Sequence, residues 1–188
     1  PGVNTSQGEG HRDAVVFRGV RSTADFYQDG LRDDVQYYRS LYNVEQVEII
    51  KGANALMFGR GGTGGLINRV SKTAQIGETF GSLDVGGDSF GAGDVALDGN
   101  VQVNDSVAFR INFHVDSLAN HRDMYSGDRV GVNPTMKFEV NSDTFINLSY
   151  EYADHERFVD RGIPTLDSSK SPIESMKDIV FGTEDLNK

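Results

Sequence analysis

The sequence predicts a compact mixed α+β unit followed by antiparallel strands of the membrane β-barrel type. Up to about Ile76 the chain mixes short apolar strands, turns and one or two short helices, whereas after Gly77 apolar and polar residues alternate over long runs. The connections between these runs alternate too, since tight turns at 103–106 and 141–143 are interleaved with longer polar segments at 119–128 and after Glu156. Short turns at one end and long loops at the other are typical of outer-membrane barrels.

In the first part, short strands are expected where β-branched and aromatic residues gather. These are 14–17, 25–28, 47–50 and 66–72, and Asp29-Gly30 is a hairpin-turn signal. Helical turns are expected at 40–44 and 53–58. The result is a small α+β unit.

In the second part, strands are expected at 78–86, 91–103, 106–118, 129–140 and 144–156. The run 107–116 places five apolar side chains on one face and polar ones on the other, over about the length that a tilted strand needs to cross a bilayer. The expected lipid-facing residues are Phe109, Ile111, Phe113, Met136, Ile146 and Leu148, with Tyr150 and Tyr152 near the outer interface. A soluble β-sandwich also alternates, so this alternative stays open.

The composition excludes several classes. The 188 residues carry a net charge of −10, which argues against a nucleic-acid partner. With no cysteine, neither a disulfide framework nor a cysteine metal site can form, and the spacing of the four histidines shows no compact metal pattern. No apolar run approaches the roughly 20 residues of a membrane helix.

The stretch FGRGGTGGLINRVSK contains Gly59, Gly61 and Gly64 in the spacing G-x-G-x-x-G. A dinucleotide site needs a strand before such glycines and a helix after them. Here the residues after Gly65 indicate a strand, so a glycine-dense connection is the better interpretation. A dinucleotide-dependent enzyme remains a competing hypothesis that an NAD titration would test.

Four ordered motifs in the first part resemble the plug domain of TonB-dependent outer-membrane receptors. They are FRGV at 17–20, FYQDGLRD at 26–33, YNVEQVEIIKGA at 42–53 and the glycine stretch at 58–72. Val132-Asn133-Pro134 and Asp160-Arg161-Gly162-Ile163-Pro164 further resemble the ferric-siderophore receptors. The second of these motifs, with Phe181-Gly182 downstream, most resembles the catecholate-type subgroup. The resemblance implies an α+β plug domain, residues 1–76, followed by the antiparallel β-strands of an incomplete transmembrane β-barrel and external loops, residues 77–188. We therefore expect the chain to be a fragment that starts within the plug and lacks the TonB box.

The same resemblance implies the function. It indicates a receptor of the bacterial outer membrane, not an enzyme, that binds a ferric siderophore and imports it with TonB and its inner-membrane energising complex as partner. The siderophore is then the transported ligand, and no cofactor is expected. A receptor for cobalamin, haem or a sugar, or a soluble β-sandwich binding module, is the alternative.

The ligand residues follow from the resemblance at Arg18 and in the loop after the Asp-Gly turn. Arginine can pair with the oxygens of an anionic catecholate and stack on its rings, and tyrosine can stack or donate a hydrogen bond. The expected set is Arg18, Asp33, Asp34, Gln36, Tyr37, Tyr38, Arg39, Arg122 and Arg161. The alternatives are that Arg18 pairs with Glu45 or Glu48, that the tyrosines pack against the barrel wall, and that Arg161 pairs with Asp160.

Overall fold

A computed structural model describes residues 2–6, 11–22, 25–52, 58, 64–165 and 171–180. The chain divides into two compact units, Pro1–Lys72 and Thr73–Lys188. The change of pattern in the sequence, near residue 76, lies a few residues beyond this division.

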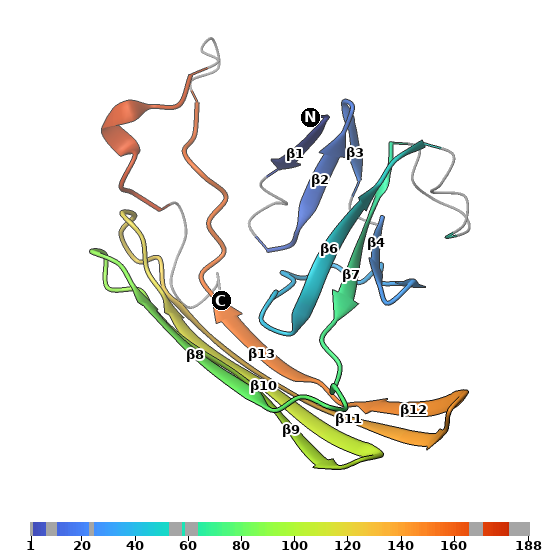
Figure 1. Ribbon diagram of the computed structural model, residues 1–188. Coiled ribbons are helices and arrows are strands. Elements are labelled where there is room, and N and C mark those ends of the chain that lie inside the picture. The colour runs from blue at the N-terminus through green and yellow to red at the C-terminus, as the bar shows by residue number, and fades with distance from the viewer. Residues whose placement is uncertain are drawn as a thin grey trace. The chain divides into compact units, whose positions relative to one another are not determined.

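The first unit contains two small sheets (Figure 1). One is antiparallel, in the order β1-β2-β3, and consists of β1 (Val3–Ser6), β2 (Ala14–Phe17) and β3 (Val20–Ser22). The other has the order β5-β4-β7-β6, from β4 (Phe26–Gln28), β5 (Leu31–Arg32), β6 (Val44–Ile50) and β7 (Leu66–Ser71). Within it β4 and β7 are parallel, while the other pairs are antiparallel.

The core of this unit consists of side chains from both sheets. Val15, Phe17 and Phe26 form one buried cluster, against which Val3 and Ile67 pack. Tyr27 and Leu66 form a second cluster with Ile50 and Phe58. The ring of Tyr27 meets that of Phe58 edge-on, with centroids 5.1 Å apart, and the Tyr27 hydroxyl donates to the Phe58 carbonyl at 3.2 Å. The strands predicted at 14–17, 25–28, 47–50 and 66–72 therefore contribute this core.

The Asp29-Gly30 turn joins β4 and β5, as the sequence predicts. Both residues have positive φ, 51° and 80°, which suits a tight hairpin and is easiest for glycine and aspartate. The turn is tied to β7, because the amide of Asp29 donates to the carbonyl of Arg69 at 2.9 Å and the amide of Gly30 donates to Asn68 Oδ1 at 3.0 Å. The start of the following loop is thereby attached to the centre of the sheet.

The prediction of a helical turn at 40–44 is wrong. The amide of Val44 donates to the carbonyl of Leu41 at 3.2 Å, which closes a single tight turn, and β6 starts at once at Val44. The β-branched residues that follow favour the strand over a helix. Of the second expected helical turn, 53–58, all residues except Phe58 lie outside the described residues.

The second unit is a long, curved antiparallel sheet (Figure 1). Its strands are β8 (Phe80–Gly87), β9 (Gly93–Asn104), β10 (Val107–Leu118), β11 (Gly127–Asn141), β12 (Thr144–Ser149) and β13 (Tyr152–Arg157). The order is β12-β11-β10-β9-β8, and β13 also pairs with β11. A short 3₁₀ turn, η3 (Glu174–Met176), follows later in the chain. Within the described residues, no helix is long and apolar enough to cross a membrane.

The single strand predicted at 144–156 is two strands. β12 pairs with the second half of β11 and β13 with its first half, so they lie end to end along one edge and the chain leaves the ladder at Tyr150 and Glu151. This break lies opposite Pro134, which has no N–H to donate to a neighbouring strand. The amide of Tyr150 still donates to the carbonyl of Pro134 at 3.1 Å.

Burial in this sheet is the reverse of that in a soluble sandwich. The large buried side chains of its described strands are polar: Asn100, Asn112 and Asn133 are fully buried beside the small Ala108, and Arg110, Asp116 and Thr135 are nearly as buried. On the other face large apolar side chains are exposed: Leu83, Val85, Leu97, Val101, Val115, Ile146 and Leu148. A sandwich would bury the apolar face against a second sheet, so the alternation indicates a wall whose apolar face meets lipid.

Candidate functional site

The segment after the Asp-Gly turn, residues 32–39, borders a pocket of about 400 Å³ in the first unit. Its lining comes from β4, from the turn and from the loop itself, with Gln28, Arg32, Asp33, Asp34 and Tyr37 among the residues. Because β4 is hydrogen-bonded to β7, the pocket has one rigid wall and one wall made of loop. This is the region where the sequence predicts ligand contact.

Asp33 is the centre of a compact charge cluster. One oxygen, Oδ2, accepts hydrogen bonds from Arg39 Nε at 2.9 Å, from Arg69 Nη2 at 2.7 Å and from the Tyr37 hydroxyl at 2.8 Å. The side chains of Arg39 and Arg69 are 3% and 7% exposed, and that of Asp33 is 15% exposed. Two arginines and a tyrosine thus satisfy one largely buried carboxylate.

These contacts shift two pKa values. Burial alone would raise the pKa of Asp33, but hydrogen bonds from Arg39 and Tyr37, with the charges of Arg39 and Arg69, outweigh it and lower the pKa of this carboxyl. The pKa of Tyr37 is raised, first by burial and then by its hydrogen bond to Asp33. At neutral pH Asp33 is therefore ionised and Tyr37 protonated.

Arg39 also closes the loop on itself. Its guanidinium donates to the main-chain carbonyls of Asp33 at 2.9 Å, Val35 at 2.7 Å and Tyr37 at 3.3 Å. It lies 4.1 Å above the ring centre of Phe26 and 4.4 Å above that of Tyr37. Its backbone amide donates to Asp13 Oδ2 at 2.9 Å. Arg39 is thus an organising residue for this loop, enclosed by the residues that it holds.

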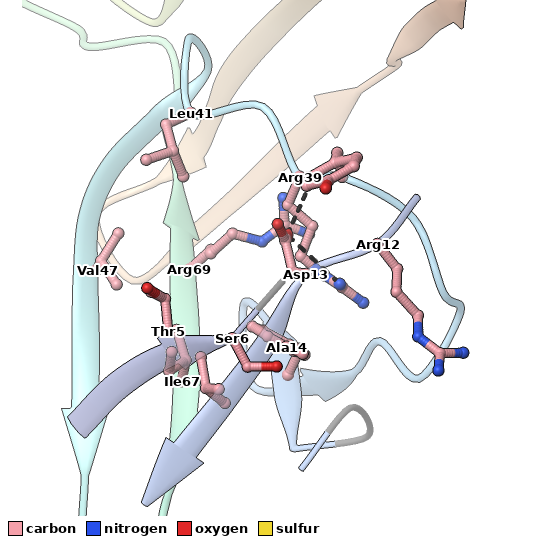
Figure 2. Close-up of a pocket in the computed structure, with 13 residues that line it drawn as sticks. Thr5, Ser6, Arg12, Asp13, Ala14, Arg39, Leu41, Val47, Ile67 and Arg69 are labelled. Atoms are coloured by element: carbon pink, nitrogen blue, oxygen red, sulfur yellow. Dashed lines mark hydrogen bonds and ion pairs between the residues drawn. The ribbon is translucent and has the colours of Figure 1, made fainter. Parts of the chain in front are cut away.

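A second pocket, of about 430 Å³, lies between the two small sheets (Figure 2). Its walls are mostly apolar, with Ala14, Leu41, Val47 and Ile67 on them, and Arg39, Arg69 and Asp13 are among its charged residues. The dashed lines in Figure 2 mark the contacts between Arg39 and Asp13, and Arg69 pairs with Asp33. The charge cluster therefore separates this interior pocket from the outer one.

Other predicted ligand residues lie on the outside of the loop. Asp34 has a 63% exposed side chain and forms an ion pair with Arg32 at 3.6 Å. Gln36 is exposed and accepts a hydrogen bond from Arg12. Tyr38 is half-buried and borders the interior pocket. Only part of the predicted set therefore faces solvent.

Arg18 occupies the tip of the β2–β3 hairpin. It has φ 47°, an unusual value for a residue other than glycine, and its side chain is exposed. Glu48, one of its suggested partners, accepts hydrogen bonds from Asn68 Nδ2 at 2.8 Å and Gln46 Nε2 at 3.0 Å. The turn geometry holds the Arg18 side chain away from the core.

The glycine motif has a packing role where the structure describes it. A Cβ on Gly64 would lie 2.5 Å from Cβ of Phe17, and one on Gly65 would lie 2.9 Å from the carbonyl oxygen of Ile50. Gly65 also has φ 149°, which side-chain-bearing residues rarely adopt. The next element is the strand β7, so the helix that a dinucleotide site requires at this position is replaced by a strand. Gly59 and Gly61 lie outside the described residues.

The two predicted arginines of the second unit differ in their surroundings. Arg161 is exposed, as a ligand contact requires. Arg122 is buried, and its Nε lies 2.6 Å from Oδ2 of Asp160. The suggested local pair between Asp160 and Arg161 is thus replaced by a pair between Asp160 and Arg122. Arg122 lies within the protein, whereas the sequence suggests an open position at the mouth.

Sequence reasoning missed Arg69 and Asp13. Arg69 is a buried residue of the strand β7, and its charge there is a signal that a buried carboxylate lies nearby. Asp13 precedes β2 and carries no signal that relates it to Arg39, 26 residues away.

Comparison with known proteins identifies the class. The TonB-dependent Receptor Plug Domain family matches residues 1–66. A probable TonB-dependent siderophore receptor, PiuA of Acinetobacter baumannii, is 33% identical over 98% of this chain and 26% of its own. The catecholate siderophore receptor Fiu of Escherichia coli K12 is 32% identical over 82% of this chain and 20% of its own, and the metal-pseudopaline receptor CntO of Pseudomonas aeruginosa is 31% identical over 63% and 17%.

Solved structures agree with these relatives. The crystal structure of PiuA superposes with a TM-score of 0.89 at 30% identity, covering 99% of this chain and 28% of that one. The open form of Fiu superposes with a TM-score of 0.78 at 30% identity, covering 87% and 24%. The chain spans about a quarter or less of the length of these curated relatives.

The fold and the site together define a receptor plug domain joined to strands of a membrane wall, and the matched proteins are receptors rather than enzymes. The chain belongs to the TonB-dependent receptor family. The predicted fold class is confirmed, and the dinucleotide-dependent enzyme and the soluble sandwich are set aside.

Proposed function

We propose that this chain is part of an outer-membrane receptor that binds a ferric siderophore of the catecholate type and imports it by TonB-dependent transport. The observation that carries the proposal is the burial of the long sheet, in which polar side chains are covered and apolar ones exposed. A wall of this kind separates lipid from a polar lumen. The family's plug domain precedes it in the same chain.

Two observations support a catecholate siderophore as the cargo: the names of the relatives and the side chains at the surface. Relatives at 32% and 33% identity are named as siderophore receptors, one of them as a catecholate siderophore receptor. The exposed Arg18 and Arg161 and the half-buried Tyr38 offer the cationic and aromatic groups that suit an anionic aromatic ligand. No nucleoside triphosphate is supplied at the outer membrane. TonB with its inner-membrane energising complex is therefore the proposed source of energy for import.

The predicted site residues take two roles in this proposal. Arg18, Asp34, Gln36, Tyr38 and Arg161 are the candidate ligand contacts, with Asp34 acting through its ion pair to Arg32. Asp33, Tyr37 and Arg39 hold the loop that presents them, because their polar atoms already bind one another.

The test is iron uptake by the full-length parent receptor in an iron-starved bacterium whose own siderophore receptors are deleted. Radioactive iron is supplied on a catecholate and on a hydroxamate carrier, with and without TonB. We expect uptake from the catecholate carrier alone, and only with TonB. An outer-membrane receptor that takes up iron from neither carrier would refute the siderophore proposal.

A second candidate is import of another metal complex, because the 31% identical relative CntO is named as a metal-pseudopaline receptor. Uptake of a different metal supplied on pseudopaline, in the same strain, distinguishes it. Arg18→Ala and Arg161→Ala then show whether the same side chains serve either cargo.

A further inference from the structure

A buried arginine connects three segments of the second unit that are far apart in the sequence. Arg122 has a side chain that is 5% exposed. Its Nη1 donates to the carbonyl of Lys177 at 3.0 Å, and its Nη2 donates to the carbonyls of Gly162 at 3.3 Å and Ile179 at 2.8 Å. Its Nε lies 2.6 Å from the carboxylate of Asp160. The guanidinium therefore contacts both later segments at once.

Main-chain contacts join the same segments. The amide of Asp123 donates to the carbonyl of Asp178 at 2.6 Å, and the amide of Phe158 donates to the carbonyl of Ser126 at 2.8 Å. Phe158 is completely buried, and Val180 is buried as well. We call residues 120–126, 158–162 and 177–180 together the loop platform. It has polar links between its segments and two buried apolar side chains, as an ordered loop assembly requires.

Arg161 lies between two residues that the platform holds. Asp160 on one side pairs with Arg122, and its Oδ1 accepts a hydrogen bond from the amide of Gly162 at 2.8 Å. On the other side, the carbonyl of Gly162 accepts a hydrogen bond from Arg122. The backbone of Arg161 is thus restrained on both sides, while its side chain is exposed.

We propose that Arg122 is a positioning residue that holds the loop platform so that Arg161 is presented to an anionic ligand at the outer opening. This inference rests on the proposed function. Three carbonyls accept from the two terminal nitrogens of one guanidinium while its Nε lies beside a carboxylate, and a lysine ammonium cannot reproduce that geometry. Restraining the loops before the ligand arrives lowers the entropy lost on binding.

Arg122 itself is unsuited to ligand contact. Reaching a ligand would break its hydrogen bonds to three carbonyls and leave Asp160 without its charged partner in a mostly buried place. The cost of such a rearrangement exceeds what one new ion pair in water returns. Arg122 therefore acts through Arg161.

The test compares Arg122→Ala, Arg122→Lys, Arg161→Ala and the control Lys177→Ala in the intact receptor, purified in detergent. Lys177 is an apt control because Arg122 contacts its carbonyl and its own side chain is exposed. Each variant is first checked for folding by its heat-modifiable migration on a gel. Cleavage of the external loops by proteinase K, without ligand, is the first readout.

We expect both Arg122 variants to be cleaved about tenfold faster than the wild type, because charge-assisted hydrogen bonds close the platform. Arg161→Ala and Lys177→Ala should be cleaved at the wild-type rate. Cleavage of Arg122→Ala at the wild-type rate would overturn the proposal. If Arg122→Ala does not fold, Arg122→Lys decides the question, since it retains the charge that pairs with Asp160.

Binding of a ferric tris-catecholate, followed by fluorescence quenching, is the second readout. Arg122→Ala and Arg161→Ala should each weaken binding, and the double variant should bind no more weakly than Arg161→Ala alone. Multiplicative losses would show that Arg122 acts independently of Arg161 and would refute the positioning role. A wild-type receptor that binds no tris-catecholate would contradict the proposed function, and the cleavage rates would then decide the role of Arg122 alone.

Discussion

The side-chain amide of Asn133 donates a hydrogen bond to the main-chain carbonyl of Tyr150 at 2.7 Å. In a regular ladder the backbone N–H of the residue after Asn133 would serve this carbonyl, but that residue is Pro134. The Asn133 side chain thus supplies the donor that Pro134 lacks. The bond it forms lies between the end of β12 and the start of β13.

Asn133→Ala should destabilise the receptor by about 1–3 kcal/mol, because it removes a buried side chain together with its hydrogen bond to the Tyr150 carbonyl. Thermal unfolding in detergent measures the loss. In a Pro134→Ala background, where an N–H returns, the same change should cost clearly less. Equal costs in both backgrounds would show that Asn133 does not compensate for the proline, and Asn147→Ala on the exposed strand β12 is the control.

Asp33→Asn should loosen the loop 33–39, because the carboxylate accepts from Arg39, Arg69 and Tyr37 at one oxygen. The expected loss is about 2 kcal/mol of local stability, the cost of leaving buried donors and charges unpaired. Hydrogen exchange of the loop amides measures it. Asp34→Asn, at an exposed neighbour, should change exchange little, and similar effects of the two variants would argue against a special role for Asp33.

The same loop should lose stability in acid. The folded-state pKa of Asp33 lies below its ordinary value, so its contribution is complete above that value and is lost as the pH falls through the lowered pKa. Exchange protection should stay constant from neutral pH to about pH 4 and decrease below it. In the Asp33→Asn receptor, exchange protection of the loop should not decrease in this pH range. An unchanged decrease would show that another carboxylate causes it.

Gly64→Ala should destabilise the first unit by about 1–3 kcal/mol, because a Cβ there would overlap the side chain of Phe17. Gly81→Ala is the matched control, since the nearest heavy atom to its Cβ would lie 4.0 Å away. Chemical denaturation monitored by tyrosine fluorescence compares them. Equal stability of the two variants would exclude close packing as the reason for glycine at position 64.

Ile111→Arg should cost about 2–4 kcal/mol in a lipid bilayer, if the apolar face of β10 meets the middle of the membrane. Folding into lipid vesicles from denaturant measures the change. Ile111→Leu, which retains the apolar character, should be nearly neutral. A small effect of the arginine would place the lipid on the other face of the strand.

Much of the fold is local and therefore readable in the sequence. Alternating residues 107–116 predicted β10, and Asp29-Gly30 predicted the β4–β5 hairpin, because side-chain direction and turn geometry depend on adjacent residues. The break within 144–156 was not predicted, because its cause lies on the neighbouring strand at Pro134. The alternation of apolar and polar residues continues through Tyr150 and Glu151, although the pairing with β11 is interrupted there.

The candidate site was only partly predictable for the same reason. The motif after the Asp-Gly turn drew attention to residues 32–39. However, Arg69, 36 residues beyond Asp33, is one of the partners that hold the Asp33 carboxylate. Arg122 and Arg161 look alike in the sequence as arginines in polar loops. The carbonyls that bury Arg122 come from residues 40 to 57 positions away.

By itself, the sequence determined the succession of a mixed unit and long alternating strands, the turns between them and the family to which the plug motifs belong. Only the tertiary structure decided which polar side chains hold the protein together and which face outward. Charged groups are neutralised by whichever partners the fold brings near, and a buried charge must find them. Those partners are set by long-range pairing, which local sequence patterns do not record.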